Sequence, residues 1–233
     1  MSVLDSCEKT RVVCYTTMET IAFVEKCIND AHTEQVFLPN EILKRVGMTG
    51  TKTRRFYNAI CSRPDTVYLE IGTWHGSSSV SALYSNRIHA TFIDNWSEFG
   101  GNKDILISAL EEFKGQSTYT LIESDSWVLD HSRLGMFDVY LYDGGHAYQD
   151  HYNAISHYIQ HLKDGCIVMI DDWNWEDVRR GTLDAFAALN VEIVYKKEIH
   201  TTTTHFDPSR PDEAHWWNGT GIFVIGTNQY KHA

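Results

Sequence analysis

Three aspartates stand where predicted strands end, and they are the strongest candidates for a chemical role. Asp143 follows the apolar run at 138–142, and Asp171 and Asp172 follow the run at 166–170. Taken singly, each of them could be a loop carboxylate or a helix cap. Several carboxylates buried together are costly without a cation. Oxygen ligands without a cysteine or histidine cluster favour Mg²⁺, with Ca²⁺ or Mn²⁺ as alternatives and zinc less favoured.

A histidine follows the first of these aspartates by three residues. His146 lies in the sequence L-Y-D-G-G-H, in which two glycines keep the loop open. A histidine near a metal-bound hydroxyl can take its proton, so His146 is a candidate general base beside Asp143. The alternative is a histidine that lies on the surface or caps a helix.

The stretch V-Y-L-E-I-G-T-W-H-G-S-S-S, residues 67–79, predicts a buried strand, a tight glycine turn and the start of a helix. Such a turn is a usual place for a nucleotide-like cofactor in an α/β sheet. Gly72 lets the backbone approach a ligand, and Gly76 lets the helix start close to the strand. A plain strand-to-helix turn is the alternative.

The spacing within this turn favours one class of cofactor over another. It reads E-x-G-x-x-x-G, and neither the dinucleotide pattern G-x-G-x-x-G nor the phosphate-binding G-x-x-x-x-G-K-[ST] occurs there. The carboxylate of Glu70 would repel a pyrophosphate, but it suits a cation such as the sulfonium of S-adenosylmethionine. Asp94, at the end of the next predicted strand, could accept both ribose hydroxyls of a nucleoside.

Strands and helices alternate from residue 66 onward. The predicted strands are 67–71, 90–94, 118–122, 138–142, 166–170, 191–195 and 221–226, and helical patterns between them cover 77–86, 103–114, 147–163 and 175–188. This alternation predicts an α/β fold, a Rossmann-like, doubly wound, mostly parallel seven-stranded sheet with helices on both faces. Residues 1–62 are predicted to form an N-terminal helical extension and residues 63–233 the Rossmann-like core. Helical patterns in the extension cover 15–47, with a second piece that opens at Pro39 and Asn40, and 53–61. Residues 1–233 are therefore predicted to be one domain.

Composition limits the partners. Twenty basic and 31 acidic residues give a net charge of −11, which argues against nucleic acid and favours a small-molecule partner. No apolar run approaches the length of a membrane span. The five cysteines are scattered, and the first residues lack the apolar core of a signal peptide. These features predict reduced thiols in a cytoplasmic protein away from membranes, and they leave homo-oligomerisation open.

Taken together, the motifs resemble those of class I S-adenosylmethionine-dependent methyltransferases, from about Met48 to the last predicted strand. Within that superfamily the chain is similar to the metal-dependent small-molecule O-methyltransferases of the catechol and macrocin groups. E-I-G-T-W-H-G matches the cofactor loop, and G-M-T-G resembles the upstream segment that covers the methionine end of the cofactor. E-S-D-S-W resembles the loop beside the adenine. F-D-V-Y-L-Y-D-G-G-H and G-C-I-V-M-I-D-D-W match the two strands that carry the metal ligands.

The resemblance implies a role for each matched residue. The implied catalytic residues are His146 and Asp143, and the implied metal ligands are Asp143, Asp171 and Asp172. The implied cofactor-binding residues are Met48, Thr49, Glu70, Gly72, Gly76, Ser77, Asp94, Ser124, Asp125 and Asp143. The implied activity is methyl transfer from S-adenosylmethionine to a hydroxyl of a sugar, polyol or phenolic compound, assisted by a divalent cation, Mg²⁺ first.

Two positions depart from the catechol group. His146 stands where those enzymes carry a lysine base, and Asp172 stands where they carry asparagine. Histidine in a D-G-x-H context is frequent in families related to the macrocin group, so the identity of the base stays open.

Two functions are alternatives to methyl transfer. One is a nicotinamide-dependent oxidoreductase, which the missing G-x-G-x-x-G disfavours, and the other is a non-catalytic cofactor-binding scaffold. Four tryptophans could wall a substrate pocket or pack as core or lid: Trp173, Trp175, Trp216 and Trp217.

Overall fold

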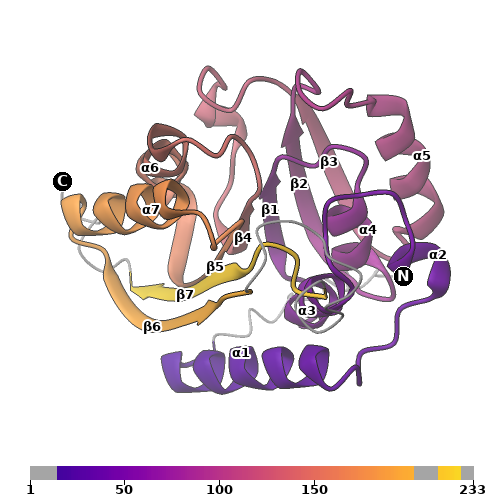
Figure 1. Cartoon of the computed structure of the whole chain (residues 1–233), viewed down its shortest axis with the longest axis horizontal. Helices are drawn as coiled ribbons and strands as arrows, with labels where there is room; N and C mark the ends of the chain where they lie inside the picture. The colour runs from indigo at the N-terminus through magenta and orange to yellow at the C-terminus, as the bar shows by residue number, and fades with distance from the viewer. Residues whose placement is uncertain (1–14, 202–214, 227–233) are drawn as a thin grey trace, which may run out of the picture.

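A seven-stranded sheet forms the centre of the protein, which we describe from a computed structural model covering residues 15–201 and 215–226 (Figure 1). The strand order is β3-β2-β1-β4-β5-β7-β6. The strands are β1 Val67–Ile71, β2 His89–Asp94, β3 Thr118–Glu123, β4 Phe137–Tyr142, β5 Leu162–Asp171, β6 Glu192–Ile199 and β7 Thr220–Gly226. Strands β1 to β5 are parallel, whereas β7 runs antiparallel between β5 and β6. The predicted mostly parallel α/β sheet is therefore confirmed.

Helices cover both faces of this sheet. They are α1 Thr17–His32, α2 Asn40–Leu43, α3 Thr51–Ile60, α4 Ser77–Leu83, α5 Lys103–Phe113, α6 Tyr148–Ser156 and α7 Glu176–Ala188, with short 3₁₀ turns η1 His131–Arg133 and η2 Ile159–His161. Apolar side chains of α1, α3, α4 and α5 share one core cluster with one face of the sheet. Those of α6 and α7 share a second cluster with the opposite face.

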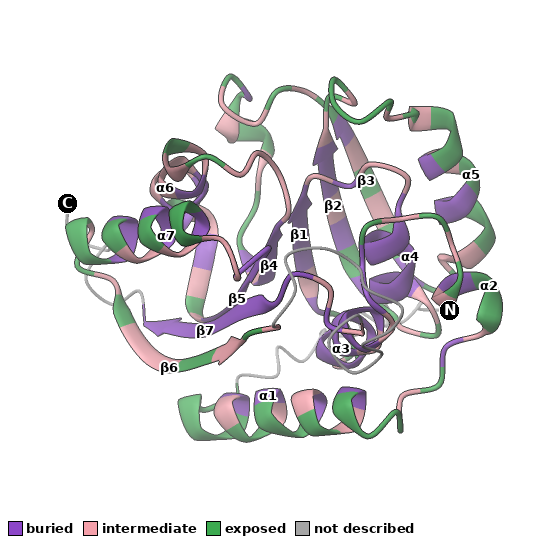
Figure 2. Ribbon diagram, in the orientation of Figure 1, coloured by how far each residue is buried: buried purple, intermediate pink, exposed green. Residues whose placement is uncertain are grey.

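The burial pattern follows the periodicity of each element. Helix α1 starts at a capping box made by Thr16 and Glu19, and it buries Val24, Cys27 and Ala31 at spacings of three and four. Strand β7 is buried over its whole length, as expected for a strand with neighbours on both edges and helices on both faces. Figure 2 shows the same contrast, with buried central strands and exposed outer sides on α1 and α5.

The helical pattern over 15–47 forms two pieces, with the second opening at Pro39 and Asn40 as predicted, but that second piece is shorter than expected because it ends at Leu43. Helix α1 ends at His32, Glu34 adopts a left-handed φ of 58°, and Pro39 precedes the one-turn helix α2. Proline fixes its own φ and lacks an N–H, so it suits a helix start and not a helix interior. The prediction over 147–163 was also too long, because α6 ends at Ser156 and β5 begins at Leu162.

Three of the five cysteines lie within the described residues. Cys27, Cys61 and Cys166 are buried free thiols, as predicted, whereas Cys7 and Cys14 lie outside the described residues. The described helices include none that is long and apolar enough to cross a membrane.

Candidate functional site at the carboxyl edge of the sheet

A cavity of about 460 Å³ opens at the carboxyl ends of the parallel strands. It lies beside β1 and β4, between which the strand order reverses, the usual ligand position in a doubly wound sheet. Most of the residues singled out from the sequence line it: Met48, Thr49, Gly72, Ser77, Asp94, Ser124, Asp125, Asp143, His146 and Asp172. Glu70, Gly76 and Asp171 are not among the lining residues.

Gly72 allows β1 and β4 to meet closely at the floor of the cavity. Its φ is +86°, and a Cβ at this position would lie 1.9 Å from the carbonyl oxygen of Asp143. Gly76 plays a different part, because it is the N-cap of α4 with a φ of +84°. A Cβ on Gly76 would meet the flexible end of Leu106 at 2.5 Å. Of these two glycines, Gly72 is the one at which a side chain would meet both an unfavourable φ and a backbone atom.

Asp94 binds the glycine loop with its carboxylate. One oxygen accepts hydrogen bonds from the backbone N–H groups of Thr73 and Trp74, both at 2.7 Å, and the other accepts one from the N–H of Trp96 at 2.6 Å. The indole of Trp96 also donates to the carbonyl of Trp74 at 2.9 Å. Asp94 thus lines the cavity as predicted, but it also connects the loop after β1 to the loop after β2.

Glu70 does not reach the cavity, contrary to the expectation that it would face a cationic cofactor. Its side chain is fully buried beneath the loop, where it accepts hydrogen bonds from Ser78 at 2.6 Å, Ser79 at 2.8 Å and Tyr68 at 2.9 Å. Burial raises the pKa of Glu70 to about 7, although these three hydroxyls act in the opposite direction. Glu70 therefore ties β1 to the first turn of α4.

The segment before α3 forms a wall of the cavity with α4. The hydroxyls of Thr49 and Ser77 lie 2.9 Å apart, and the buried Arg54 donates from Nε to the carbonyl of Thr49 at 2.9 Å. Gly47 is needed here, because a Cβ at that position would lie 2.2 Å from the Ser77 hydroxyl oxygen. Met48, 40% exposed, lines the cavity next to this pair.

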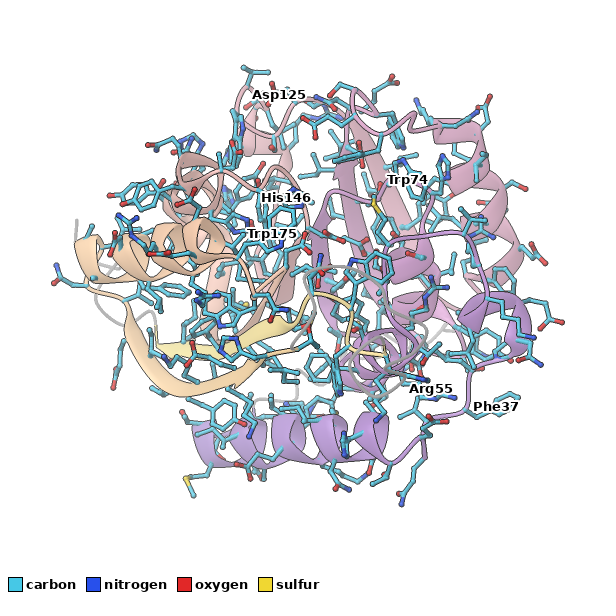
Figure 3. The ribbon with its side chains drawn as sticks, in the orientation of Figure 1. Phe37, Arg55, Trp74, Asp125, His146 and Trp175 are labelled. Carbon is cyan, nitrogen blue, oxygen red and sulfur yellow. The ribbon has the colours of Figure 1, made fainter. Side chains whose placement is uncertain are left out.

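The loop after β3 supplies another wall. Asp125 accepts a hydrogen bond from the backbone N–H of Trp127 at 2.8 Å, and the hydroxyl of Tyr158 donates to the carbonyl of Ser126 at 2.8 Å. Figure 3 shows Asp125 at the end of the molecule to which these loops project, with Trp74, His146 and Trp175 below it in the view. Ser124 and Asp125 both line the cavity, as the adenine-side prediction requires.

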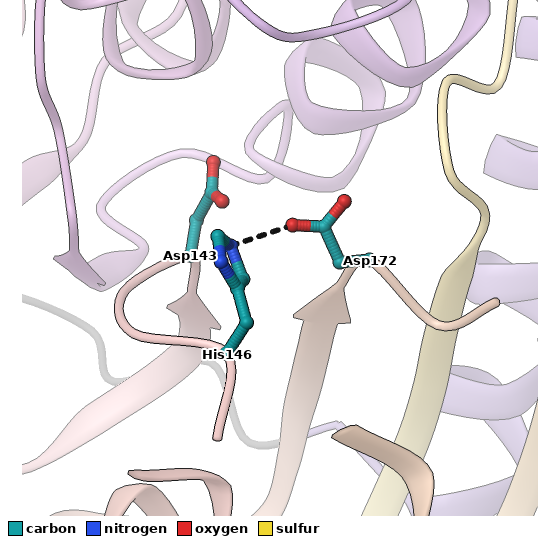
Figure 4. A group of neighbouring side chains, drawn as sticks. All are labelled: Asp143, His146 and Asp172. Carbon is teal, nitrogen blue, oxygen red and sulfur yellow. Dashed lines mark ion pairs between the residues drawn. The ribbon is translucent and has the colours of Figure 1, made fainter. Parts of the chain in front are cut away.

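Asp143, His146 and Asp172 form a compact group at the ends of β4 and β5 (Figure 4). Each offers one ligand atom, and these atoms lie within 4.8 Å of one another. His146 Nε2 is 2.7 Å from Asp172 Oδ2. Burial opposes protonation of His146, but its hydrogen bond to Asp172 and the charge of that carboxylate outweigh burial and raise the pKa. The imidazole also packs edge-on against Trp175, with ring centroids 4.7 Å apart.

Asp171 lies behind this group and outside its ligand cluster. His146, and not Asp171, joins Asp143 and Asp172 in this group. Asp171 is the last residue of β5, and the side chains of consecutive residues along a strand point to opposite faces of the sheet. Burial and the charge of Asp172 raise the pKa of Asp171 well above its ordinary value. Its Oδ1 is buried and has no hydrogen-bond partner within the described part of the chain.

The donor set fits a hard divalent cation. Carboxylate oxygens with one imidazole, plus a buried orphan carboxylate oxygen nearby, are groups that an oxygen-preferring metal would satisfy. Burial, followed by the charges of Asp171 and Asp172, also raises the pKa of Asp143 well above its usual value. A bound cation would relieve this repulsion.

Sequence reasoning missed several residues of the site. Asn218 donates from Nδ2 to Asp172 Oδ1 at 2.6 Å, and Glu98 and Asp150 line the same cavity. Asn218 lies 46 positions after Asp172, and only the antiparallel pairing of β7 with β5 brings them together. Nothing in the local sequence around Asn218 marks it, because its role depends on strand pairing.

The comparisons with known proteins agree with this fold. Residues 69–173 match the family model described as a methyltransferase domain. No curated protein matches the sequence. A Streptococcus mutans protein described as a SAM-dependent methyltransferase matches with 13% identity and a TM-score of 0.54 over 78% of this chain and 49% of its own. The chain thus spans about half the length of that protein.

Two other structures match over almost their full length. The O-methyltransferase from Bacillus cereus in complex with SAH has 12% identity and a TM-score of 0.51, over 92% of this chain and 93% of its own. The [4+2]-cyclase SpnF has 14% identity and a TM-score of 0.51, over 91% and 97%. At such identities the structures show a shared fold, and the cyclase shows that this fold does not by itself fix the reaction.

The chain therefore shares the α/β fold of these methyltransferase structures, with its cavity at the carboxyl edge of the sheet. Residues 69–173, which match the methyltransferase-domain model, carry the glycine loop, Asp94, Asp143 and Asp172.

Proposed function

We propose that the protein transfers a methyl group from S-adenosylmethionine to a hydroxyl oxygen of a small molecule, assisted by a divalent cation, Mg²⁺ first. The observation that supports this most strongly is the composition of one cavity. The cavity of about 460 Å³ is lined on one side by the glycine loop, Asp94 and the loop at 124–127. The group formed by Asp143, His146 and Asp172 lines the same cavity. A methyl donor and a metal-bound acceptor could therefore lie within one enclosed space.

The cofactor side of the cavity would be built from four segments. Met48 and Thr49 would lie against the methionine end, and Ser124 with Asp125 would lie against the adenine. Between these two ends, the cofactor would lie against the backbone at Gly72 and the start of α4 at Ser77. Asp94 would accept the ribose hydroxyls only by sharing lone pairs that already bind Thr73, Trp74 and Trp96, so it would hold cofactor and loop together.

Asp143 and Asp172 would hold the cation, with His146 or Asp171 completing the set. When bound, Mg²⁺ would lower the pKa of an acceptor hydroxyl and orient it. The acceptor oxygen would use an electron pair to form the new O–CH₃ bond as the CH₃–S bond breaks, which leaves a neutral thioether. The hydroxyl proton would pass to His146, and Asp172 would stabilise the resulting imidazolium.

A small neutral or cationic acceptor suits the remaining walls. Trp175 and Trp217 line the cavity near His146 and could contact a sugar or aromatic ring. The residues described as lining the cavity include six carboxylates and no lysine or arginine. This composition disfavours a nucleic acid as the acceptor, because its phosphates would be repelled. The carboxylates are Asp94, Glu98, Asp125, Asp143, Asp150 and Asp172.

Calorimetry and a methyl-transfer assay test the proposal together. We expect S-adenosylhomocysteine to bind in the micromolar range, and NAD not to bind, because the loop lacks the dinucleotide pattern. Chelator should abolish methyl transfer to a panel of small hydroxyl compounds while it leaves cofactor affinity largely intact. Cofactor binding without transfer in the presence of Mg²⁺ would favour a non-catalytic scaffold. Full transfer in excess chelator would leave the aspartates as a polar network that positions the acceptor.

The role of His146 can be separated from metal binding. If His146 is the general base, the variant His146→Ala should have a kcat lower by about 10²–10⁴-fold, with little change in cofactor affinity. Mn²⁺ affinity, followed by electron paramagnetic resonance, should then stay near that of the unaltered protein. A large loss of Mn²⁺ affinity would make His146 a ligand instead. A variant with near-normal kcat would contradict the base assignment.

A further inference from the structure

Two histidines outside the cavity face each other through their ring nitrogens. His131 belongs to η1 and His161 to η2, and neither is among the residues that line the cavity. The Nδ1 atom of His131 lies 3.1 Å from the Nε2 atom of His161, and the ring centroids are 5.1 Å apart. Both side chains are partly buried. Two segments that are 30 positions apart in the chain therefore meet through a pair of imidazoles.

The backbone fixes the tautomer of His161. Its Nδ1 lies 3.1 Å from the carbonyl oxygen of Gly135. Because a carbonyl oxygen can only accept, this Nδ1 carries a proton, and the Nε2 of the neutral ring carries a lone pair. Histidines that bind metals usually have this arrangement, in which one ring nitrogen donates to a carbonyl or carboxylate and the other faces the metal. The Nε2 of His161 is thus held as a ligand atom that faces His131.

His131 favours its neutral form. Burial, followed by the charges of His161 and His157, lowers the pKa of His131, although Asp130 acts in the opposite direction. Facing the lone pair of His161, the Nδ1 of neutral His131 carries the proton and donates it to the shared hydrogen bond. A move of that proton to Nε2 of the same ring gives the other neutral tautomer. Two lone pairs would then face each other, and no proton would have to leave the ring.

The separation of the two nitrogens fits one tetrahedral metal ion. Zn²⁺ binds imidazole nitrogen at about 2.0–2.1 Å, and tetrahedral geometry places two such nitrogens about 3.3 Å apart. The observed 3.1 Å needs only a small shift to reach this value. Imidazole nitrogen suits Zn²⁺, Cu²⁺ and Ni²⁺, whereas Mg²⁺ prefers oxygen ligands. The histidine pair therefore differs in metal preference from the aspartates of the cavity.

We propose that His131 and His161 form a second metal site, outside the cavity, which binds a borderline divalent ion of the Zn²⁺ type. Within the described residues, three candidate ligand atoms lie together within 4.8 Å only at the ends of β4 and β5. Water would therefore complete the coordination of an ion at the histidine pair. This site goes beyond the proposed methyl transfer and does not depend on it.

An ion at this site would join η1 to η2 next to one wall of the cavity. The ring of Tyr158 packs against that of His131, with centroids 4.9 Å apart, and the Tyr158 hydroxyl donates to the carbonyl of Ser126 at 2.8 Å. The histidine pair is therefore packed against a residue that holds the loop at 124–127. Because the ligand atoms come together only in the folded chain, the ion would stabilise the fold by mass action.

Nitrogen-15 NMR of the histidine rings tests the proposal on the full chain, with Zn²⁺ as the probe. As Zn²⁺ is added, the Nδ1 signal of His131 and the Nε2 signal of His161 should shift together. The proton of His131 should move to its Nε2, while His161 keeps its proton on Nδ1. His131→Ala and His161→Ala identify the two rings among the twelve histidines of the chain. The signals of His146 report separately on Zn²⁺ in the cavity.

His161→Asn removes the ligand atom and keeps the backbone contact. The asparagine amide can still donate to the carbonyl of Gly135, but it has no atom in the place of Nε2. Zn²⁺ affinity, followed by the His131 signal, should fall at least about tenfold, which corresponds to about 1.4 kcal/mol. His89→Asn is the matched control, because His89 is exposed and its Nδ1 lies 2.8 Å from the hydroxyl of Thr118. The control should bind Zn²⁺ at His131 as the unaltered protein does.

The titration of the unaltered protein decides the proposal even if a variant does not fold. The proposal is wrong if Zn²⁺ shifts neither signal, or only one of them, because a shared ion must affect both rings. Equal Zn²⁺ affinity in His161→Asn and the unaltered protein would also overturn it. If the shifts of His131 and His161 vanish in Asp172→Asn, the ion lies in the cavity and the second site does not exist.

Discussion

Individual polar residues in this protein act mainly by holding backbone segments around the cavity. Asp94 binds three backbone N–H groups of two loops, and Glu70 binds hydroxyls on β1 and α4. Asp172 is shared between His146 and Asn218. Two of these carboxylates also line the cavity, so the same atoms that would meet a ligand already fix the shape of the site.

Glu70 should make the stability of the protein depend on pH. Burial raises its pKa from an ordinary 4.5 to about 7 in the folded protein. Between these values the folded protein keeps a proton that the unfolded chain has lost. The stability contributed by protonated Glu70 is therefore complete below pH 4.5 and is lost as the pH rises through 7.

The measurement compares the free energy of unfolding of the unaltered protein with that of Glu70→Gln. From pH 5 to pH 8 the unaltered protein should lose up to about 3 kcal/mol relative to the variant, at about 1.4 kcal/mol per pKa unit. Urea unfolding at several pH values gives both quantities, and Glu41→Gln, at an exposed position, is the control. A difference that grows in favour of the unaltered protein as pH rises would show that the three hydroxyls keep Glu70 ionised.

At the scale of elements, the site depends on how closely the strands and loops approach one another. Parallel pairing places Ile71 beside Tyr142, so Gly72 and Asp143 leave their strands side by side. The antiparallel pair Asp171 and Thr220 places Asn218 opposite the loop after β5. Helix α4 begins at Ser77, and its N-cap Gly76 follows the loop that Asp94 binds.

Gly72→Ala should be much more destabilising than an ordinary glycine replacement. It combines a φ of +86° with a Cβ only 1.9 Å from the Asp143 carbonyl oxygen. Gly115→Ala is the matched control, because its φ is +53° but no atom lies within 4 Å of the added Cβ. We expect Gly72→Ala to cost about 1–3 kcal/mol more than Gly115→Ala in chemical unfolding, the range for forced overpacking. Equal costs would mean that β1 and β4 can separate at this point without penalty.

The whole molecule concentrates negative charge at one edge of its sheet. The net charge is −11, and every described charged residue that lines the cavity is acidic apart from the titratable His146. Such a field favours a cationic methyl donor and a divalent ion over anionic ligands. In the proposed reaction the sulfonium charge is lost on transfer, so this field would favour donor binding more than the chemical step.

The amino-acid sequence alone determined the layered, mostly parallel α/β fold and the succession of strands and helices along the chain. Strand β1 and helix α7 have clear patterns in the sequence, so 67–71 and 175–188 were placed within about one residue. Boundaries of helices and strands that depend on the conformation of a single residue were harder to predict. The left-handed Glu34 and the early start of β5 at Leu162 have no strong periodic signal.

For the site, the sequence identified residues that follow strand ends, because parallel strands bring their carboxyl ends to one edge. That reasoning found Asp94, Asp143, His146 and Asp172. Only the tertiary structure showed that Glu70 points beneath the loop and that Asp171 and Asp172 diverge. It alone brought in Asn218, because antiparallel pairing of β7 with β5 joins residues 46 positions apart, and local sequence carries no record of that contact.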